Sequence, residues 1–312
     1  MACTRQRYGR ERSQNPFPGS QKLKIISASV CLSAALICHP LLSRAEPASL
    51  VPSSGAYIGL GFDLNSTQFN DQELEATGIS TITNTASGAL VTSGSAGGPP
   101  VGIDMDSSNS IAPVIQAGYF QKFQESSYLW GAKFSYSYTG GATSTTNNIR
   151  IPQFGAYQDG TPFTGNALAR SYQKTVNNQI ALIPYIGQSF ERSTIYFGAG
   201  PTASQVNTKI NNLVGFADLN GVRTNVSGEP QSFADTQWVC GGVAMLGGTY
   251  FLRKDWFLDF SYSYAMTQNK TSNYYSTFNN PASPNTFSGS LIGNSTGTAT
   301  IQTLSFTVNK LF

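Results

Sequence analysis

Three charged residues, Asp63, Lys133 and Asp259, stand in stretches that otherwise alternate large apolar residues with small ones. In each stretch, the charge lies in the set of alternate positions that also holds glycine, serine or tyrosine. If these stretches are strands with an apolar outer face, the three charges point into a narrow interior. An unpaired charge is costly there, so we expect Lys133 to pair with Asp259, with Asp63 or with both. The pairing is either a structural salt bridge that fills the interior or a gate whose opening admits ions.

The other groups that could do chemistry are acids between these stretches. They are Asp71, Glu73 and Glu75, and Asp104 with Asp106. Carboxylates bind hard cations such as Ca²⁺, but neither cluster has EF-hand spacing, so we interpret both as solvated acids and predict no metal and no cofactor. The only histidine, His39, lies in a segment that we expect to be removed. Without imidazole as a base, a serine or cysteine nucleophile lacks its usual activation, and we predict that the protein is not an enzyme.

Residues 1–45 have the pattern of a cleaved secretory signal peptide. A basic segment precedes an apolar run from Ile25 to Leu42, and Ser43-Arg44-Ala45 follows. Small residues at those last positions suit a signal peptidase. The run is interrupted by His39-Pro40 and is short for a spanning helix, which needs about 20 residues. We therefore predict cleavage after Ala45, with 46–54 as the segment ahead of the first strand.

Removal of this leader changes what the composition implies. The chain has 19 Lys and Arg against 16 Asp and Glu. The leader holds seven of the basic residues and one acid, which leaves twelve basic and fifteen acidic residues. The basic excess belongs to the leader, so nothing indicates nucleic-acid binding. Three of the four cysteines also leave, and Cys240 alone cannot form an intrachain disulfide.

The rest of the chain shows a recurring two-residue period in stretches of roughly ten residues, typical of barrel strands. The clearest stretch sets Trp130, Phe134 and Tyr138 against Lys133 and Ser135. We predict eight strands, at 56–64, 111–121, 130–138, 177–187, 194–204, 238–251, 256–267 and 298–312. Short links alternate with four long polar links, which are 68–110, 139–175, 205–235 and 268–297.

Four aromatic residues are predicted to lie at the edges of the apolar face, where membrane–water interfaces favour such rings. They are Trp130, Trp238, Tyr250 and Trp256. Twelve residues separate Trp238 from Tyr250, and a tilted strand of that length rises roughly 28 Å, close to an apolar band of about 25 Å.

Over residues 55–312 the chain resembles the small OmpA-like and opacity-type outer-membrane β-barrels. The resemblance rests on the segments 195–201, 247–251 and 258–264 and on the terminal Phe312. It implies an all-β fold: an eight-stranded antiparallel up-and-down transmembrane barrel with four long extracellular loops, a monomer with both termini in the periplasm. Phe312 resembles the signal read by the barrel assembly machinery, whereas Lys310 stands where the family often has an aromatic residue.

The resemblance also implies lipid, lipopolysaccharide and periplasmic chaperones as partners. The first functional hypothesis is a non-enzymatic surface protein of the outer membrane, a surface antigen that supports the envelope and whose loops contact host or surface ligands. The four long links make up more than half of the chain after the leader, which favours a role for the loops. The alternative is a porin-like channel for small solutes. An interior closed by side chains favours the first hypothesis, and a continuous water path favours the second.

Overall fold

The computed structural model describes residues 49–219 and 221–312, so the predicted signal peptide 1–45 lies outside the described residues. In these ranges the chain forms twelve strands, and every pairing between them is antiparallel. The strands are β1 (Ser54–Asn84), β2 (Leu90–Gly97), β3 (Val101–Ile103), β4 (Ser108–Lys122), β5 (Tyr128–Tyr157), β6 (Pro162–Ser189), β7 (Ser193–Leu219), β8 (Val222–Asn225), β9 (Gln231–Arg253), β10 (Trp256–Thr267), β11 (Ser272–Ala282) and β12 (Asn285–Leu311).

No helix in the described part of the chain is long and apolar enough to cross a membrane.

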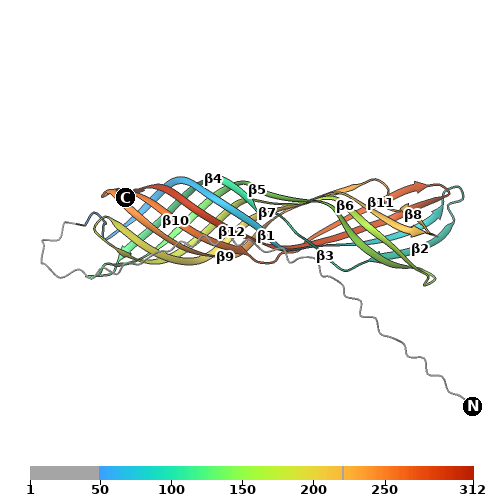
Figure 1. The fold of residues 1–312 in the computed structure, drawn as a ribbon, viewed down its shortest axis with the longest axis horizontal. Coiled ribbons are helices and arrows are strands. Elements are labelled where there is room, and N and C mark those ends of the chain that lie inside the picture. Colours follow the sequence, from blue (N-terminus) through green and yellow to red (C-terminus); the bar gives the residue numbers. More distant parts are fainter. Residues whose placement is uncertain (1–48, 220) are drawn as a thin grey trace, which may run out of the picture. The chain divides into compact units, whose positions relative to one another are not determined.

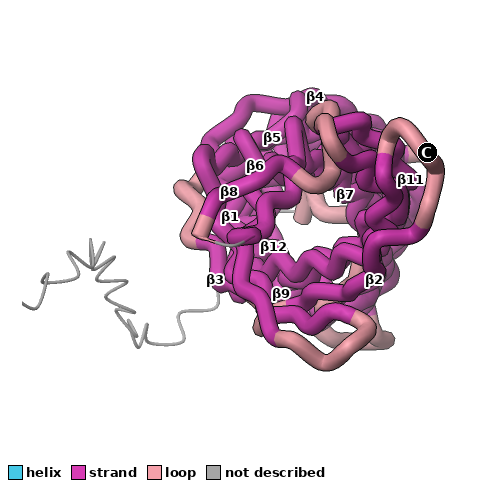
Figure 2. The backbone as a smooth tube through the Cα atoms, turned by 90° about the vertical axis from the view of Figure 1, so that its right-hand side faces the viewer, coloured by secondary structure: helices cyan, strands magenta, loops and turns pink. Residues whose placement is uncertain are grey.

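Eight of the strands pair in a ring. The pairings run β1–β4–β5–β6–β7–β9–β10–β12, and β12 pairs back with β1. The eight segments predicted as strands fall on these eight, except that Phe312 follows the end of β12. Figure 2 shows the strands arranged around a common axis. The other four are additions to this ring: β2 pairs with β1 and β5, β3 with β1, β8 with β7, and β11 with β12.

The four segments predicted as long loops are mostly strand, so that prediction was wrong. β1 alone has 31 residues, and β5 and β6 stay paired up to Ala156 and Pro162. Strand pairing satisfies the backbone polar groups that a loop would leave to water, and it buries a second apolar cluster. We call the part formed by 68–110, 139–175, 205–235 and 268–297 the distal section, and the rest of the described chain the proximal section. The labels β2, β8 and β11 mark the distal section in Figure 1, at the end away from the C-terminus.

The proximal section shows strict alternation between an exposed apolar face and a buried face. On β1, Ile58 and Phe62 are exposed whereas Tyr57 and Asp63 are buried. The strand at 238–251 has weak apolar character on both parities, yet the structure exposes Trp238 and buries Val239 there. A ring of strands with large apolar side chains outside places the smaller and polar residues inside.

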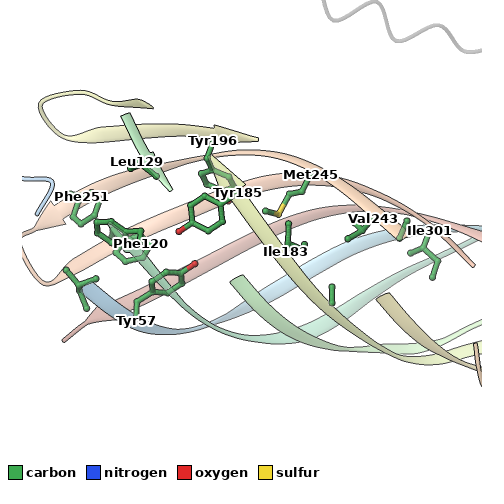
Figure 3. Close-up of a cluster of buried hydrophobic side chains, with 14 of the residues drawn as sticks. Tyr57, Phe120, Leu129, Ile183, Tyr185, Tyr196, Val243, Met245, Phe251 and Ile301 are labelled. Carbon is green, nitrogen blue, oxygen red and sulfur yellow. The ribbon is translucent and has the colours of Figure 1, made fainter. Parts of the chain in front are cut away.

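Inside the proximal section, aromatic rings pack over glycines of neighbouring strands. A Cβ atom on Gly131 would lie 2.4 Å from the ring of Tyr185, and one on Gly247 would lie 2.4 Å from the Tyr196 hydroxyl. Glycine in a strand allows this close approach. Figure 3 shows Tyr185 and Tyr196 in the same buried cluster as Phe120.

The distal section has its own buried cluster, which includes Leu74, Ile151, Ile210 and Leu291. Tyr172 lies fully buried in it and its hydroxyl lies 2.6 Å from Ser295 Oγ. The alternation therefore continues beyond the proximal section, with apolar residues now on the inner face.

The segment ahead of β1 covers the proximal end of the interior. Of the predicted segment 46–54, the structure describes 49–54, and β1 begins at Ser54. Val51 is buried, and its carbonyl accepts a hydrogen bond from Lys122 Nζ at 2.9 Å. The Leu50 amide donates to the Glu191 carbonyl at 2.8 Å.

Candidate functional site

Lys133 and Asp259 form an ion pair inside the proximal section. Their side chains are 3% and 2% exposed. Lys133 lies on β5 and Asp259 on β10, which are four pairings apart in either direction around the ring. The ion pair therefore joins opposite sides of the interior.

Tyr196 on β7 completes this contact. Lys133 Nζ donates to the Tyr196 hydroxyl at 2.7 Å, and that hydroxyl donates to Asp259 Oδ1 at 2.5 Å. The ammonium also lies 4.8 Å from the centroid of the Tyr196 ring. Hydrogen bonds to charged groups are stronger than those between neutral groups, so these three side chains hold one another in place.

Gln116 and Asn309 extend the network on the other side of Asp259. The Gln116 amide nitrogen lies 3.0 Å from Asp259 Oδ2, 2.7 Å from Thr307 Oγ1 and 2.7 Å from Asn309 Oδ1. An amide has two hydrogens, so these three acceptors share them. Both carboxylate oxygens of Asp259 thus have donors, as a buried carboxylate requires.

Asp63 lies apart from the ion pair. It is buried on β1, and its Oδ1 atom has no hydrogen-bond partner within the described chain. It faces a cavity of about 40 Å³ whose lining also includes Lys133, Gln179, Ser261 and Ser305. A polar cavity of this size has room for water. The structure therefore brings Lys133 and Asp259 together and leaves Asp63 on the neighbouring cavity.

The sequence hypothesis missed Tyr196, Gln116 and Asn309 as members of this network. The sequence did indicate that all three side chains point inward, because each occupies an inward-facing alternate position of its strand. Parity alone does not give the relative height of residues on strands that are not neighbours, so the contacts could not be assigned.

An aromatic layer fills the interior between this network and the segment 49–53. The Phe251 and Phe257 rings stack with centroids 4.9 Å apart, and Tyr57 meets Phe257 edge-on at 5.2 Å. Phe120 meets Phe251 edge-on at 6.4 Å. Figure 3 shows Tyr57, Phe120 and Phe251 together at one end of the cluster.

The outer face of the proximal section is apolar. Its exposed large side chains include Ile58, Leu60, Phe62, Ile115, Phe134, Leu182, Ile186, Ile195, Phe197, Leu246, Leu258, Phe260 and Val308. The predicted edge aromatics are also exposed: Trp130 by 42%, Trp238 by 48%, Tyr250 by 48% and Trp256 by 39%. Trp256 pairs with Lys310 near the proximal end, and Trp238 pairs with Gln205 at the border with the distal section.

The last strand ends with a charge and an exposed ring. Lys310 Nζ lies 2.5 Å from Asp255 Oδ2 and 5.2 Å from the centroid of the Trp256 ring. These contacts explain how a lysine is accommodated at a position where an aromatic residue was expected. The Phe312 amide donates to the Ala56 carbonyl at 2.8 Å, and the Phe312 side chain is 76% exposed.

The acidic clusters lie in the distal section. Among residues 49–219 and 221–312, no three His, Cys, Asp or Glu side chains gather closely enough to hold a metal ion. Glu75 instead accepts a hydrogen bond from Asn294 at 2.8 Å, and Asp104 and Asp106 are exposed. Cys240 is exposed on the outer face of β9.

No family model matches this sequence, and no curated protein matches it. The chain aligns over most of its length with several solved outer-membrane and surface proteins, at low identity and low TM-score. The outer membrane protein OprG from Pseudomonas aeruginosa has 9% identity and a TM-score of 0.37, over 85% of this chain and 99% of that one. Neisserial surface protein A has 11% identity and a TM-score of 0.30, over 81% of this chain and 99% of that chain. A third structure is that of Ail, the attachment invasion locus protein of Yersinia pestis, in complex with the heparin analogue sucrose octasulfate. It has 10% identity and a TM-score of 0.26, over 79% of this chain and 99% of that chain.

Proposed function

We propose that this chain is a bacterial outer-membrane protein whose proximal section crosses the membrane as an eight-stranded barrel. The ring of pairings supports this because it gives the backbone polar groups of every spanning strand a partner within the protein, which hydrocarbon demands. The outer face supports it too. Between the level of Trp130, Tyr250 and Trp256 and that of Trp238, the outward residues of the eight strands carry no acid or base, and Lys310 stands at the proximal edge.

The height of the apolar face fits a bilayer. On β5 it extends from Tyr128 to Tyr138, and these eleven residues, ten steps along the strand, rise about 23 Å at a tilt of about 45°. Charged outward residues appear only beyond this face, with Glu73, Arg150 and Lys209 exposed on the distal section. We place the spanning segments at 56–66, 111–121, 128–138, 178–188, 195–205, 238–250, 256–266 and 302–312, with both termini in the periplasm.

We further propose that the protein is a non-enzymatic surface and envelope protein whose distal section contacts partners outside the cell. The observation that carries this is the filled interior. Lys133 and Asp259 meet from opposite sides of the ring, and the aromatic layer with Val51 occupies the space on the proximal side. A barrel of eight strands is just wide enough for its own side chains to fill.

The distal section is suited to recognition because its strands hold side chains at fixed spacings. Large apolar residues are exposed there, among them Ile79, Phe154, Val222 and Tyr275. Aromatic and aliphatic residues on a rigid surface are typical anchors of protein interfaces. The partner would be a host surface component or lipopolysaccharide.

The test compares the intact protein with a variant in which short turns replace the distal parts of all four hairpins. We expect the shortened barrel to reach the outer membrane at normal levels and to lose binding to cells or lipopolysaccharide. The purified intact protein should give no stepwise conductance in planar bilayers. Equal binding by both forms would contradict the role of the distal section, and steady conductance would contradict the filled interior.

One observation favours the alternative of a small-solute channel. The cavity at Asp63 is lined mainly by polar side chains and lies directly beside the Lys133–Asp259 pair. Opening of that pair would extend a polar path. In this case the Lys133→Ala variant should raise conductance or change the preference for cations, with little loss of stability.

A further inference from the structure

Lys174 is a buried cation without a countercharge. It lies on the inward face of β6 in the distal section and is 5% exposed. Its strand neighbours in register are Ser144 on β5 and Thr208 on β7. Among residues 49–219 and 221–312, its ammonium has neither a hydrogen bond nor an ion pair, whereas the other buried lysine, Lys133, has both.

A buried ammonium needs compensation. A protonated lysine carries three donors, and a buried charge without a partner is strongly unfavourable. Burial lowers the pKa of Lys174 from 10.5 to about 8, and no carboxylate contributes to that shift. At neutral pH most of the population is still protonated, so a positive charge remains inside the distal section.

Lys174 lines a small cavity of about 20 Å³, which is partly open to solvent on the side of the exposed Lys270. The polar lining consists of Lys174, Lys270, Thr208, Gln237, Ser272 and Thr298, and no acid lines it. The nearby Asp235 is in contact with the Gln237 amide. Ser144, beside Lys174 in the sheet, has a buried hydroxyl without a hydrogen-bond partner in the described chain. Two lysines and several hydroxyl donors around one cavity suit an anion rather than a cation.

The volume limits the occupant. A space of this size takes about one water-sized particle. This narrow space suits a monatomic halide better than a polyatomic anion such as phosphate or sulfate. A water molecule would also fit but would leave the positive charge uncompensated.

We propose that the distal section binds one chloride ion between Lys174 and Lys270. The ion accepts hydrogen bonds from the Lys174 ammonium and from hydroxyls of the lining, and it neutralises the buried charge. This site lies outside the surface contacts proposed above and does not depend on them. It makes the stability of the distal section respond to the halide concentration of the medium.

The first test is the melting temperature of the folded protein in zwitterionic micelles at pH 6.5. Sodium chloride is compared with sodium gluconate at equal ionic strength, because gluconate is too large for the cavity. We expect a higher melting temperature in chloride, with a constant increment for each tenfold rise in chloride above the dissociation constant. Crystals grown in sodium bromide should show an anomalous peak beside Lys174.

Two lysine variants separate this site from general salt effects. Lys174→Met should remove the difference between chloride and gluconate. Lys209→Met, an exposed neighbour on β7, should retain it. Equal melting temperatures of the natural protein in the two salts, chloride dependence that persists in Lys174→Met, or bromide that binds only elsewhere would each overturn the proposal. If Lys174→Met does not fold, the salt comparison and the bromide position in the natural protein still decide.

Discussion

The Lys133–Asp259 pair places two opposite charges in a space largely closed to water, so each depends on the other. We expect Lys133→Ala to lower the free energy of unfolding by roughly 3–5 kcal/mol, because it leaves the Asp259 carboxylate buried without a cation. The measurement is urea unfolding of the barrel in lipid vesicles. The Lys133→Ala, Asp259→Ala double variant should recover part of the loss.

Lys254 provides the control, because it is an exposed lysine in the turn between β9 and β10. Lys254→Ala should change stability by less than about 0.5 kcal/mol. If Lys133→Ala behaved like Lys254→Ala, the ion pair would contribute nothing to the closed interior.

Lys174 predicts a pH dependence with a definite sign. Its pKa is about 8 in the folded protein and near 10.5 in the unfolded chain, so the unfolded chain binds more protons between these values. Stability should therefore rise with pH from about 8 to about 10.5, by roughly 3 kcal/mol in total. The measurement is unfolding in sodium gluconate, where no halide compensates the charge. Chloride should flatten the curve, and Lys174→Met should lack the rise.

The groups around Lys174 do not reverse this sign. Ser144 and Thr208 on the flanking strands do not titrate in this range, and no carboxylate lines the cavity. Lys270 is exposed. Burial raises the pKa of Tyr274 to about 12, so its hydroxyl remains neutral across the window. A flat pH profile in gluconate would mean that Lys174 is not buried as a cation.

At the scale of the strand, Gly247 on β9 makes room for Tyr196, which holds the ion pair. A Cβ atom there would lie 2.4 Å from the Tyr196 hydroxyl, so Gly247→Ala must displace that ring. We expect a loss of about 1–3 kcal/mol, the usual cost of overpacking. Thermal unfolding checks this. Gly242→Ala on the same strand is the control, because the nearest atom to its Cβ would be 4.0 Å away. Equal effects of the two substitutions would argue against a specific role for the Tyr196 position.

At the end of β12, we expect deletion of Phe312 to affect assembly into the membrane but not the stability of the folded protein. The Phe312 side chain is 76% exposed, so it adds little to packing within the chain. We expect deletion of Phe312 to reduce the amount of protein in the outer membrane sharply and to leave export to the periplasm intact. Cell fractionation gives the result. Normal outer-membrane levels of the truncated chain would contradict an assembly role for this residue.

The strands of the proximal section could be predicted because their outward residues are mostly apolar, whereas their inward residues include many glycines, serines and threonines. The distal strands could not, because bulges change the parity of the pattern. On β1 the buried residues change from Phe69 to Gln72 and Leu74 across the irregularity at Asn70–Glu73, where Asp71 has a φ of 52°. An extra residue in the strand reverses which side chains face inward. The two-residue alternation of apolar and polar residues therefore changes phase there, and it is no longer visible over the whole strand.

The distal strands also lack an apolar outer face. On β5, the stretch from Ser144 to Asn147 is polar on both parities, because water lies outside and hydroxyls line part of the inside. Such a stretch has the composition of a loop. Only the backbone pairing of β5 with β6 makes it a strand, and sequence periodicity does not report that pairing.

For the molecule as a whole, the predicted leader leads to a simple measurement. We expect the form in the envelope to begin at Glu46, with a slight excess of acidic over basic residues. Intact-mass spectrometry of protein from outer-membrane fractions gives the mass directly. Retention of residues before Ala45 would contradict both the cleavage site and the charge balance derived from it.

We expect the pairing of β1 with β12 to form late in folding. Tyr57 pairs with Leu311 and Asn84 with Asn285, so the joint between the first and last strands of the ring consists of its most sequence-distant contacts. Such contacts form slowly, because the whole intervening chain must be gathered first. Until β12 arrives, β1 presents an open edge from Tyr57 to Asn84, and open edges recruit strands from other chains. The interval between the arrival of these two strands is therefore when the protein is most prone to aggregate.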